Sequence, residues 1–288
     1  YSEFVGRSCQ LLQGGRRVAD VGVLYPFESL AGWYRFEDPA NPRQGFFVAP
    51  ETDYLTISGW LTNALHRDFT FIHPELFLAE KYTIVNDEIH LQNAENHQQY
   101  RTLILTGGKV IGLPTLRKLY AFYQAGGTVI ATSQLPEQSA TRGKDAEVRE
   151  LIAKMFAPEQ PGKGLAIFLP EPTAEKLADA LEKTQPTPDV IVSTPPHPVP
   201  EFGKFSYIHK VKEGRHIYYF ANSSNEPVNS EVFVRGHHAL ELWDPHTGKT
   251  QPMTNQELTE RNGVAYTRLS LDLSPVRSVF FLSRPERN

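Results

Sequence analysis

Residues 101–106 read RTLILT, residues 114–127 read PTLRKLYAFYQAGG and residues 128–133 read TVIATS. The first and last of these stretches are nearly continuous apolar runs, which are typical of strands covered on both faces of a parallel sheet. The middle stretch predicts a helix over residues 114–125, because proline stands at its start, apolar residues follow at helical spacing and two glycines end it. A strand, a helix and a strand in succession predict a parallel α/β sheet.

Similar signals extend on both sides of this unit. Asn86 and Asp87 separate two short alternating segments, which predicts a hairpin over residues 82–91. The alternation of strand and helix signals predicts an α/β domain over residues 1–193. We predict its other strands at residues 18–25, 69–72, 164–169 and 190–192, and its other helices at residues 53–66, 145–156 and 173–183.

Proline marks a boundary after this domain. Residues 194–200 read TPPHPVP, a composition that favours extended polyproline geometry, so we predict a linker over residues 194–203. Every apolar run beyond it has strand character, with turn residues between the runs. This predicts an antiparallel β-sandwich over residues 204–288. Its expected strands are residues 205–211, 216–221, 230–234, 240–243, 263–271 and 277–282.

Composition limits the classes of function. The net charge of −4 and the pI near 6.2 give no polyelectrolyte signal, which disfavours a nucleic-acid partner. No apolar run approaches the ~18 residues needed to span a bilayer, which disfavours a membrane partner. Cys9 is the single cysteine, so an internal disulfide and a CxxC metal site are excluded, and we expect a buried or inert thiol. The chain starts at Tyr1 without a signal peptide, which suggests a piece of a longer protein.

Six short segments carry a resemblance to a known family. They are YSEFVGRSCQLLQGG (1–15), VADV (18–21), HRDFTFI (66–72), YRTLIL (100–105), YYFANSSNEPV (218–228) and ELWDPHTG (241–248). Together they resemble the region downstream of the catalytic barrel in α-L-rhamnosidase-like proteins of glycoside hydrolase family 106. The resemblance implies a flavodoxin-like or class I amidotransferase-like parallel sheet domain followed by the β-sandwich.

The same resemblance implies a function. The chain would be a C-terminal accessory region of a bacterial glycoside hydrolase acting on plant or bacterial polysaccharide, in the periplasm or outside the cell. Its partner would be the N-terminal catalytic domain of the same polypeptide. The catalytic carboxylates would lie on that barrel, so no residue of this chain receives a catalytic role and the isolated chain is expected to be inactive.

Aromatic residues after the first strand form the best candidate for a sugar contact. Tyr25, Glu28, Trp33 and Tyr34 lie in the segment that follows residues 18–25, at the edge where open α/β sheets bind ligands. Sugars stack on aromatic rings while carboxylates bind their hydroxyl groups, so we predict these four residues, together with Asp68, as substrate-binding. This prediction keeps a second function open, that of a free-standing carbohydrate-binding protein.

A self-sufficient hydrolase built on Glu28 and Asp68 is a third alternative. Glycoside hydrolysis needs two carboxyl groups about 5 to 9.5 Å apart. No sequence spacing links any two of Glu28, Asp53, Asp68 and Glu75, so we interpret them as surface or capping residues, with Asp53 as the N-cap of its helix.

Other chemistry has little support in the sequence. After Leu105 the chain reads TGGK, with no nucleophilic Cys or Ser at the strand-to-helix turn. His237 and His238 are adjacent, so on a strand they point to opposite faces. We predict no cofactor and no transition-metal site, and leave open a calcium site in a loop. Trp60 and Trp243 are expected to be structural.

Overall fold

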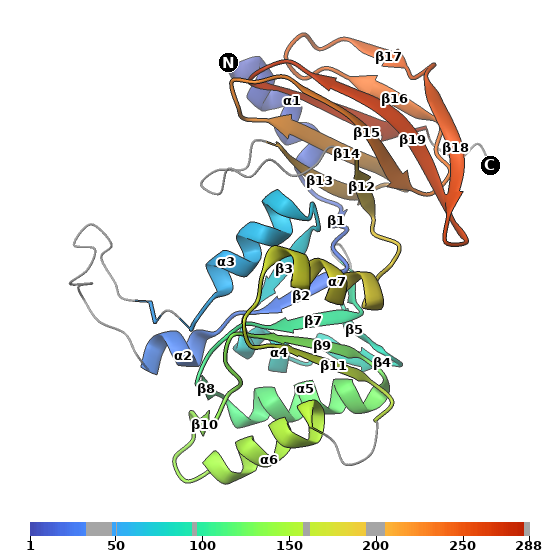
Figure 1. Ribbon diagram of the computed structural model, residues 1–288. Coiled ribbons are helices and arrows are strands. Elements are labelled where there is room, and N and C mark those ends of the chain that lie inside the picture. The colour runs from blue at the N-terminus through green and yellow to red at the C-terminus, as the bar shows by residue number, and fades with distance from the viewer. Residues whose placement is uncertain (33–47, 50, 94–96, 158–161, 194–204, 285–288) are drawn as a thin grey trace.

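The computed structural model describes residues 1–32, 48–49, 51–93, 97–157, 162–193 and 205–284 (Figure 1). An α/β part forms the lower half of the molecule in that view, and two antiparallel sheets form the upper half. Among the described residues, no helix has the length and apolar character needed to cross a membrane. The segment expected to be the linker, residues 194–203, lies outside the described residues.

The α/β part is built on a five-stranded parallel sheet with the order β11-β9-β7-β2-β3. This confirms the parallel sheet predicted from the sequence. The residues of β2 and β7 are all buried, as their continuous apolar runs indicate. The five strands are β2 (Val21–Leu24), β3 (Phe69–Ile72), β7 (Thr102–Leu105), β9 (Thr128–Thr132) and β11 (Leu165–Leu169).

Helices cover both faces of this sheet. Successive strand residues point to opposite sides, so each face presents apolar side chains that helices bury. Leu103 and Leu105 pack with helices α4, α5 and α6, whereas Ile104 packs with α3, η1 and α7. Helix α5 ends where Gly126 takes a φ of 118°, a left-handed conformation that suits glycine. The helices are α2 (Phe27–Gly32), α3 (Tyr54–Gly59), the π-helix η1 (Trp60–Ala64), α4 (Pro74–Leu78), α5 (Leu113–Ala125), α6 (Asp145–Phe156) and α7 (Ala174–Thr184).

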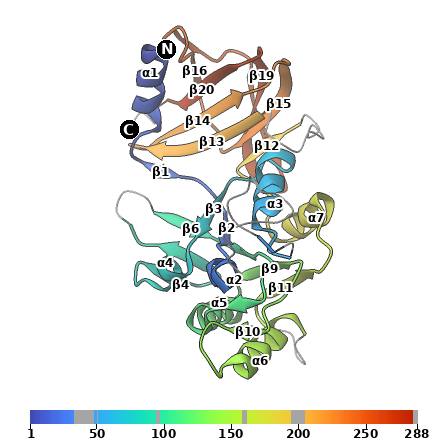
Figure 2. The ribbon, with the colours of Figure 1, turned by 90° about the vertical axis from the view of Figure 1, so that its left-hand side faces the viewer.

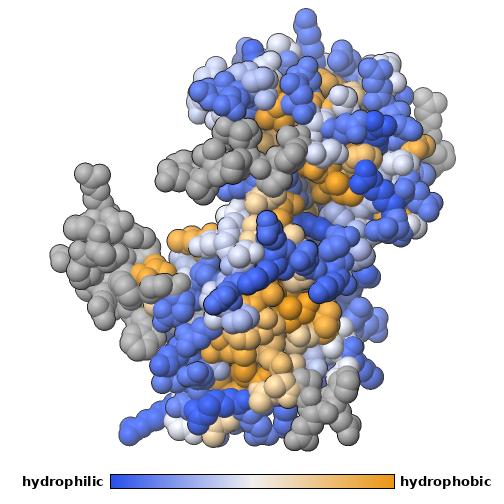
Figure 3. All heavy atoms as spheres, viewed as in Figure 1, coloured by the Kyte–Doolittle hydropathy of each residue, from blue (hydrophilic) through white to orange (hydrophobic). Residues whose placement is uncertain are grey.

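Two small sheets complete the α/β part. The predicted hairpin over residues 82–91 forms, with Asn86 at its turn in a left-handed conformation, and a third strand joins it. The face in Figure 3 shows hydrophobic side chains gathered over the α/β part, where the edge strand β11 is at least partly exposed along its length. The small sheets contain β4 (Tyr82–Val85), β5 (Glu88–Leu91) and β6 (Gln98–Tyr100), and the pair β8 (Val110–Ile111) and β10 (Gln138–Ser139).

The upper half consists of a six-stranded sheet, β1-β13-β14-β20-β16-β17, and a four-stranded sheet, β12-β15-β19-β18. The sheets share one apolar core, to which Phe220 and Phe281 contribute from the first sheet and Val232 and Leu269 from the second. The strands are β1 (Arg16–Arg17), β12 (Val190–Val192), β13 (Phe205–Lys212), β14 (Arg215–Asn222), β15 (Val228–Arg235), β16 (Leu240–Trp243), β17 (Thr250–Pro252), β18 (Gln256–Arg261), β19 (Val264–Leu273) and β20 (Arg277–Ser283).

Three segments of the amino-terminal 193 residues lie with these antiparallel sheets. Helix α1 (Ser2–Leu12) lies beside the six-stranded sheet, as Figure 2 shows, and Leu11 and Leu12 pack against the outer face of that sheet. Strand β1 pairs with β13, and β12 pairs with β15. These contacts cross the boundary placed at residue 193, because strand pairing and helix packing depend on residues far away in the sequence. Cys9 is exposed on α1, so of the two expectations, a buried or an inert thiol, the first was wrong.

Candidate functional site

The candidate site lies where strands β2 and β7 end side by side. Strand β2 comes first in the chain of the five but lies between β3 and β7 in the sheet. The connections that follow β2 and β7 therefore lead to opposite sides of the sheet. In open α/β sheets, ligands bind in the crevice at such a point, outside the carboxyl ends of the strands.

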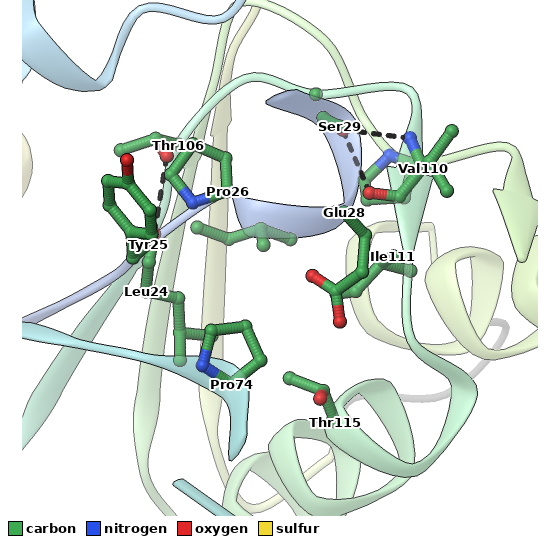
Figure 4. Close-up of a pocket in the computed structure, with 13 residues that line it drawn as sticks. Leu24, Tyr25, Pro26, Glu28, Ser29, Pro74, Thr106, Val110, Ile111 and Thr115 are labelled. Carbon is green, nitrogen blue, oxygen red and sulfur yellow. Dashed lines mark hydrogen bonds between the residues drawn. The ribbon is translucent and has the colours of Figure 1, made fainter. Parts of the chain in front are cut away.

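A small cavity occupies this crevice (Figure 4). Its volume is about 20 Å³, and Tyr25, Glu28, Thr106 and Thr115 are among the residues that line it. A cavity of this size holds one water molecule, whereas ligand pockets typically measure about 300–1,000 Å³. The described residues thus form a crevice that is too small to enclose a sugar ring.

Glu28 is the only carboxylate among the described residues that line this cavity. Figure 4 shows its carboxylate turned inward, toward Thr115. Gly112 is the N-cap of α5, and a Cβ atom there would lie 2.7 Å from Glu28 Oε1. The carboxylate therefore packs against the positive end of a helix, a favourable position for an anion. It makes no hydrogen bond or ion pair with another described residue.

The Ser29 hydroxyl holds α2 in this place. It donates to the Val110 carbonyl at 2.8 Å and accepts from the Val110 amide at 3.0 Å. Gly108 permits this contact, because a Cβ atom there would lie 2.5 Å from Ser29 Oγ. The glycine pair after β7 thus serves contacts within the chain.

Aromatic side chains cluster around Tyr25, which lines the crevice. The Tyr25 ring lies 5.3 Å from Tyr54, 6.0 Å from Phe71 and 6.2 Å from His73, and Phe27 lies 5.0 Å from His73, measured between ring centroids. We call these five residues the aromatic cluster. Phe27 is 47% exposed and Phe71 is 40% exposed, so the cluster presents ring surface to solvent beside Glu28.

Asp53 is the polar residue at the carboxyl edge whose role the sequence did not reveal. It is the N-cap residue of α3, as predicted, but its side chain makes no capping hydrogen bond. The buried carboxylate instead accepts from the Gly107 amide at 2.8 Å, Thr132 Oγ1 at 3.0 Å and Ser133 Oγ at 2.6 Å. It thereby ties the ends of β7 and β9 together. Polar residues directly after two buried strands were the signal that could have indicated this.

Asp68 lies at the opposite edge of the sheet. It directly precedes β3, and its carboxylate forms a bidentate ion pair with Arg17, with the Nε–Oδ2 hydrogen bond at 2.8 Å. The Asp68 amide donates to the Tyr207 hydroxyl at 3.3 Å, so this pair lies at the junction with the antiparallel sheets. Burial raises the pKa of Asp68 although Arg17 opposes the shift. Asp68 and Glu28 therefore do not converge.

The other predicted residues that the structure describes provide no carboxylate partner for Glu28. Glu75 is exposed on α4, and its amide donates to His73 Nδ1 at 3.3 Å. Trp33 and Tyr34 lie outside the described residues. The structure therefore brings together Tyr25 and Glu28, and their substrate-binding role stays a prediction.

Comparison with protein families identifies the chain. The family model for glycoside hydrolase family 106, described as alpha-L-rhamnosidase, matches residues 1–257. The chain belongs to this family. The match confirms the family that the sequence motifs indicated. No curated protein matches the chain by sequence.

Solved structures of large glycosidases share the fold of this family 106 chain. A rhamnosidase from Novosphingobium sp. PP1Y matches with a TM-score of 0.67 and 23% identity, over 98% of this chain and 24% of that one. An alpha-L-fucosidase isoenzyme 2 from Paenibacillus thiaminolyticus matches with a TM-score of 0.58 and 12% identity, over 100% and 51%. A beta-galactosidase from Bacillus circulans sp. alkalophilus matches at 0.59 and 12%, over 98% and 44%. The chain thus spans between 24% and 51% of these structures.

A second crevice in the family 106 chain holds two carboxylates. It measures about 270 Å³, is lined mainly by polar groups and includes Asp20 and Glu88. Glu88 pairs with Arg101 at 2.6 Å, and Asp20 pairs with Arg235 at 3.0 Å. Burial would raise the pKa of Glu88, but hydrogen bonds from Arg101 and His90 outweigh it and the pKa is lowered. A general acid for glycoside cleavage needs a raised pKa, so Glu88 is poorly suited to that role.

Metal ligands do not gather in the part of the chain that the structure describes. No group of three His, Cys, Asp or Glu side chains there could hold an ion. The adjacent histidines have separate partners, since His237 Nε2 contacts the Thr259 carbonyl at 3.2 Å and His238 Nε2 contacts the Arg235 carbonyl at 2.9 Å.

Proposed function

We propose that the chain is the C-terminal accessory region of an α-L-rhamnosidase-like glycoside hydrolase that acts on plant or bacterial polysaccharide. It supports the catalytic barrel and contributes residues of its carboxyl edge to the substrate cleft. The observation that carries this proposal is the family 106 match over residues 1–257, combined with a structural match that covers only 24% of the Novosphingobium rhamnosidase. A polymeric substrate favours a periplasmic or extracellular location.

The chemistry of the described carboxylates supports an accessory role. Cleavage of a glycoside requires an acid and a second carboxylate across one bond. The small crevice offers Glu28 alone, and Asp53 is occupied by three hydrogen bonds. Asp20 and Glu88 are both neutralised by arginines. The reacting pair is therefore expected on the catalytic domain, which we propose as the partner.

The sheet topology supports the assignment of a flavodoxin-like domain followed by a β-sandwich. Numbered along the chain, the parallel strands lie in the order 2-1-3-4-5, which is the flavodoxin-like order. The class I amidotransferase-like alternative has no nucleophile after β7, where Thr106 is followed by two glycines. Two antiparallel sheets with a shared core support the assignment of a β-sandwich.

An activity assay tests the accessory role. The isolated 288-residue chain should release no 4-nitrophenol from 4-nitrophenyl α-L-rhamnopyranoside above the buffer rate. A family 106 polypeptide that carries the catalytic barrel serves as the positive control. Hydrolysis by the isolated chain that disappears in Glu28→Gln or Glu88→Gln would refute the proposal.

The second candidate function is a free-standing carbohydrate-binding protein. The observation that favours it is the exposed ring surface of the aromatic cluster beside Glu28. In calorimetric titrations with rhamnose-containing oligosaccharides, Tyr25→Ala and Trp33→Ala should then abolish binding. Tyr1→Ala is the matched control, because Tyr1 is fully exposed and lies on the antiparallel part. Absence of binding in the unsubstituted chain would exclude this function.

A further inference from the structure

A groove lies between helix α1 and the turn that joins β16 to β17. Figure 2 shows helix α1 in the half of the molecule opposite to α5 and α6. Its volume is about 160 Å³. A protein cavity of about 150 Å³ accommodates one benzene ring, so the groove has room for one six-membered ring. Its walls are apolar at Leu11, Trp243, Pro245 and Phe280 and polar at Arg7, Gln10, Lys249 and Thr250.

The fold fixes the walls of this groove. Arg7 of α1 donates to the carbonyls of Pro245 at 3.1 Å and His246 at 3.3 Å, which fastens the helix to the turn. Gly248 permits this approach, because a Cβ atom there would lie 3.0 Å from the Arg7 guanidinium carbon and its φ is 74°. The Phe4 ring also lies 4.6 Å from the His246 ring. These contacts fix the position of α1 against the turn and so define the shape of the groove.

The carboxylate of Asp244 forms hydrogen bonds within the turn. Asp244 accepts from the His246 amide and from Thr247 Oγ1, both at 2.8 Å. These bonds define the turn geometry and leave the Asp244 oxygens committed. Asp244 thus shapes the groove and is not counted among the groups available to a ligand.

Three polar side chains at the rim of the groove are available to a ligand. Gln10, Lys249 and Thr250 are exposed, and their side chains make no hydrogen bond or ion pair with the residues that the structure describes. They offer an amide, an ammonium group and a hydroxyl beside the indole of Trp243. A ligand that matches this lining has a ring with one apolar face and a circumference of hydroxyl groups.

We propose that this groove binds one pyranose ring of a glycan, with the apolar face of the sugar on Trp243 and its hydroxyl groups on Gln10, Lys249 and Thr250. The choice of a carbohydrate rests on the proposed function, since a family 106 chain meets glycans. The site is separate from the carboxyl edge of the parallel sheet and would engage polysaccharide at a distance from that edge. Trp243 then serves both the packing of the sheet and the ligand.

Indole N–H signals provide a direct test, because the chain contains only three tryptophans. The ¹⁵N-labelled chain is titrated separately with methyl α-L-rhamnopyranoside, D-galactose and D-glucose to millimolar concentrations. The Trp243 signal, assigned by its loss in Trp243→Phe, should shift saturably with at least one sugar. The Trp60 signal should stay in place. If none of the three sugars shifts the Trp243 signal, the proposal is overturned.

Two neighbouring substitutions on α1 localise the binding. Gln10→Trp fills the groove from an exposed helical position and should weaken binding at least tenfold. Cys9→Trp adds the same ring to the adjacent exposed position, which does not line the groove, and should leave affinity unchanged. Equal affinity in both variants would overturn the proposal, as would a shift confined to Trp33, which would instead support binding at the carboxyl edge. Failure of the accessory role is recognised separately, by aryl rhamnoside hydrolysis.

Discussion

Replacement of Asp53 by alanine tests how the carboxyl edge of the parallel sheet is held together. Asp53 is 8% exposed, and its carboxylate accepts hydrogen bonds from the Gly107 amide, Thr132 Oγ1 and Ser133 Oγ. Asp53→Ala removes all three acceptor contacts at once. Gly107 and Thr132 are buried, so their donors lose a partner where water has little access.

The expected loss of stability follows from the two buried donors, the Gly107 amide and the Thr132 hydroxyl. A buried donor left without a partner costs about 1–3 kcal/mol, and the partly exposed Ser133 hydroxyl can turn to solvent. Two buried donors therefore give a loss of about 3 kcal/mol in the free energy of unfolding. For a chain of this size, that corresponds to a fall in Tm of roughly 6 °C. Asp53→Asn keeps one oxygen for the Gly107 and Thr132 donors, and it should cost about 1 kcal/mol.

Thermal unfolding followed by circular dichroism measures these differences. Asp179→Ala is the matched control, because Asp179 is exposed on α7 and makes no hydrogen bond or ion pair with a described residue, so the substitution should change stability by less than about 0.5 kcal/mol. The reasoning fails if the Asp53→Ala protein has the same Tm as the Asp179→Ala protein. It also fails if Asp53→Asn is as damaging as Asp53→Ala, since the retained oxygen would then contribute nothing.

Two further substitutions probe close packing and titration. Gly107→Ala should destabilise the chain by about 2 kcal/mol or more in urea unfolding, because the added carbon would lie 2.0 Å from the Glu51 carbonyl oxygen. Gly6→Ala, on the exposed face of α1 with nothing within 4 Å, should instead stabilise it by about 0.5 kcal/mol, and the opposite order would contradict the packing argument. Burial, aided by His209, lowers the pKa of His216 from 6.5 to about 4. As the pH falls, the unfolded chain therefore binds a proton at this histidine before the folded chain does. The free energy of unfolding then decreases as the pH falls from 6.5 toward 4. His216→Phe should flatten the decline in Tm over this range, and equal slopes in both proteins would exclude His216 as a source of it.

Local sequence signals predicted most elements of this fold. The helix expected at residues 145–156 forms over Asp145–Phe156, because helical spacing of apolar residues is a local property. The strand expected at residues 190–192 also forms, but it pairs with β15 in an antiparallel sheet. Pairing depends on distant residues, so a three-residue apolar run specifies a strand without specifying its sheet.

The candidate site was predicted less completely, for a related reason. Tyr25 and Glu28 follow β2 in sequence, so their place at the carboxyl edge could be predicted. The hydrogen bonds of Asp53 were missed, because its partners come from the ends of two other strands and only the polar residues after those strands indicated them. The groove beside Trp243 was also missed, since it forms only when the amino-terminal helix packs on a strand more than two hundred residues away.

Strand direction, however, bears on which pairs of carboxylates can act together. Strands β2 and β3 are parallel neighbours, so a residue after one and a residue before the other lie at opposite edges of the sheet. Glu28 follows β2 and Asp68 precedes β3, and with four residues at ~3.3 Å each the strands separate the two edges by roughly 13 Å. That span exceeds the ~9.5 Å limit for carboxylates that cleave one glycosidic bond. A hydrolase built on Glu28 and Asp68 is therefore excluded by the parallel pairing itself.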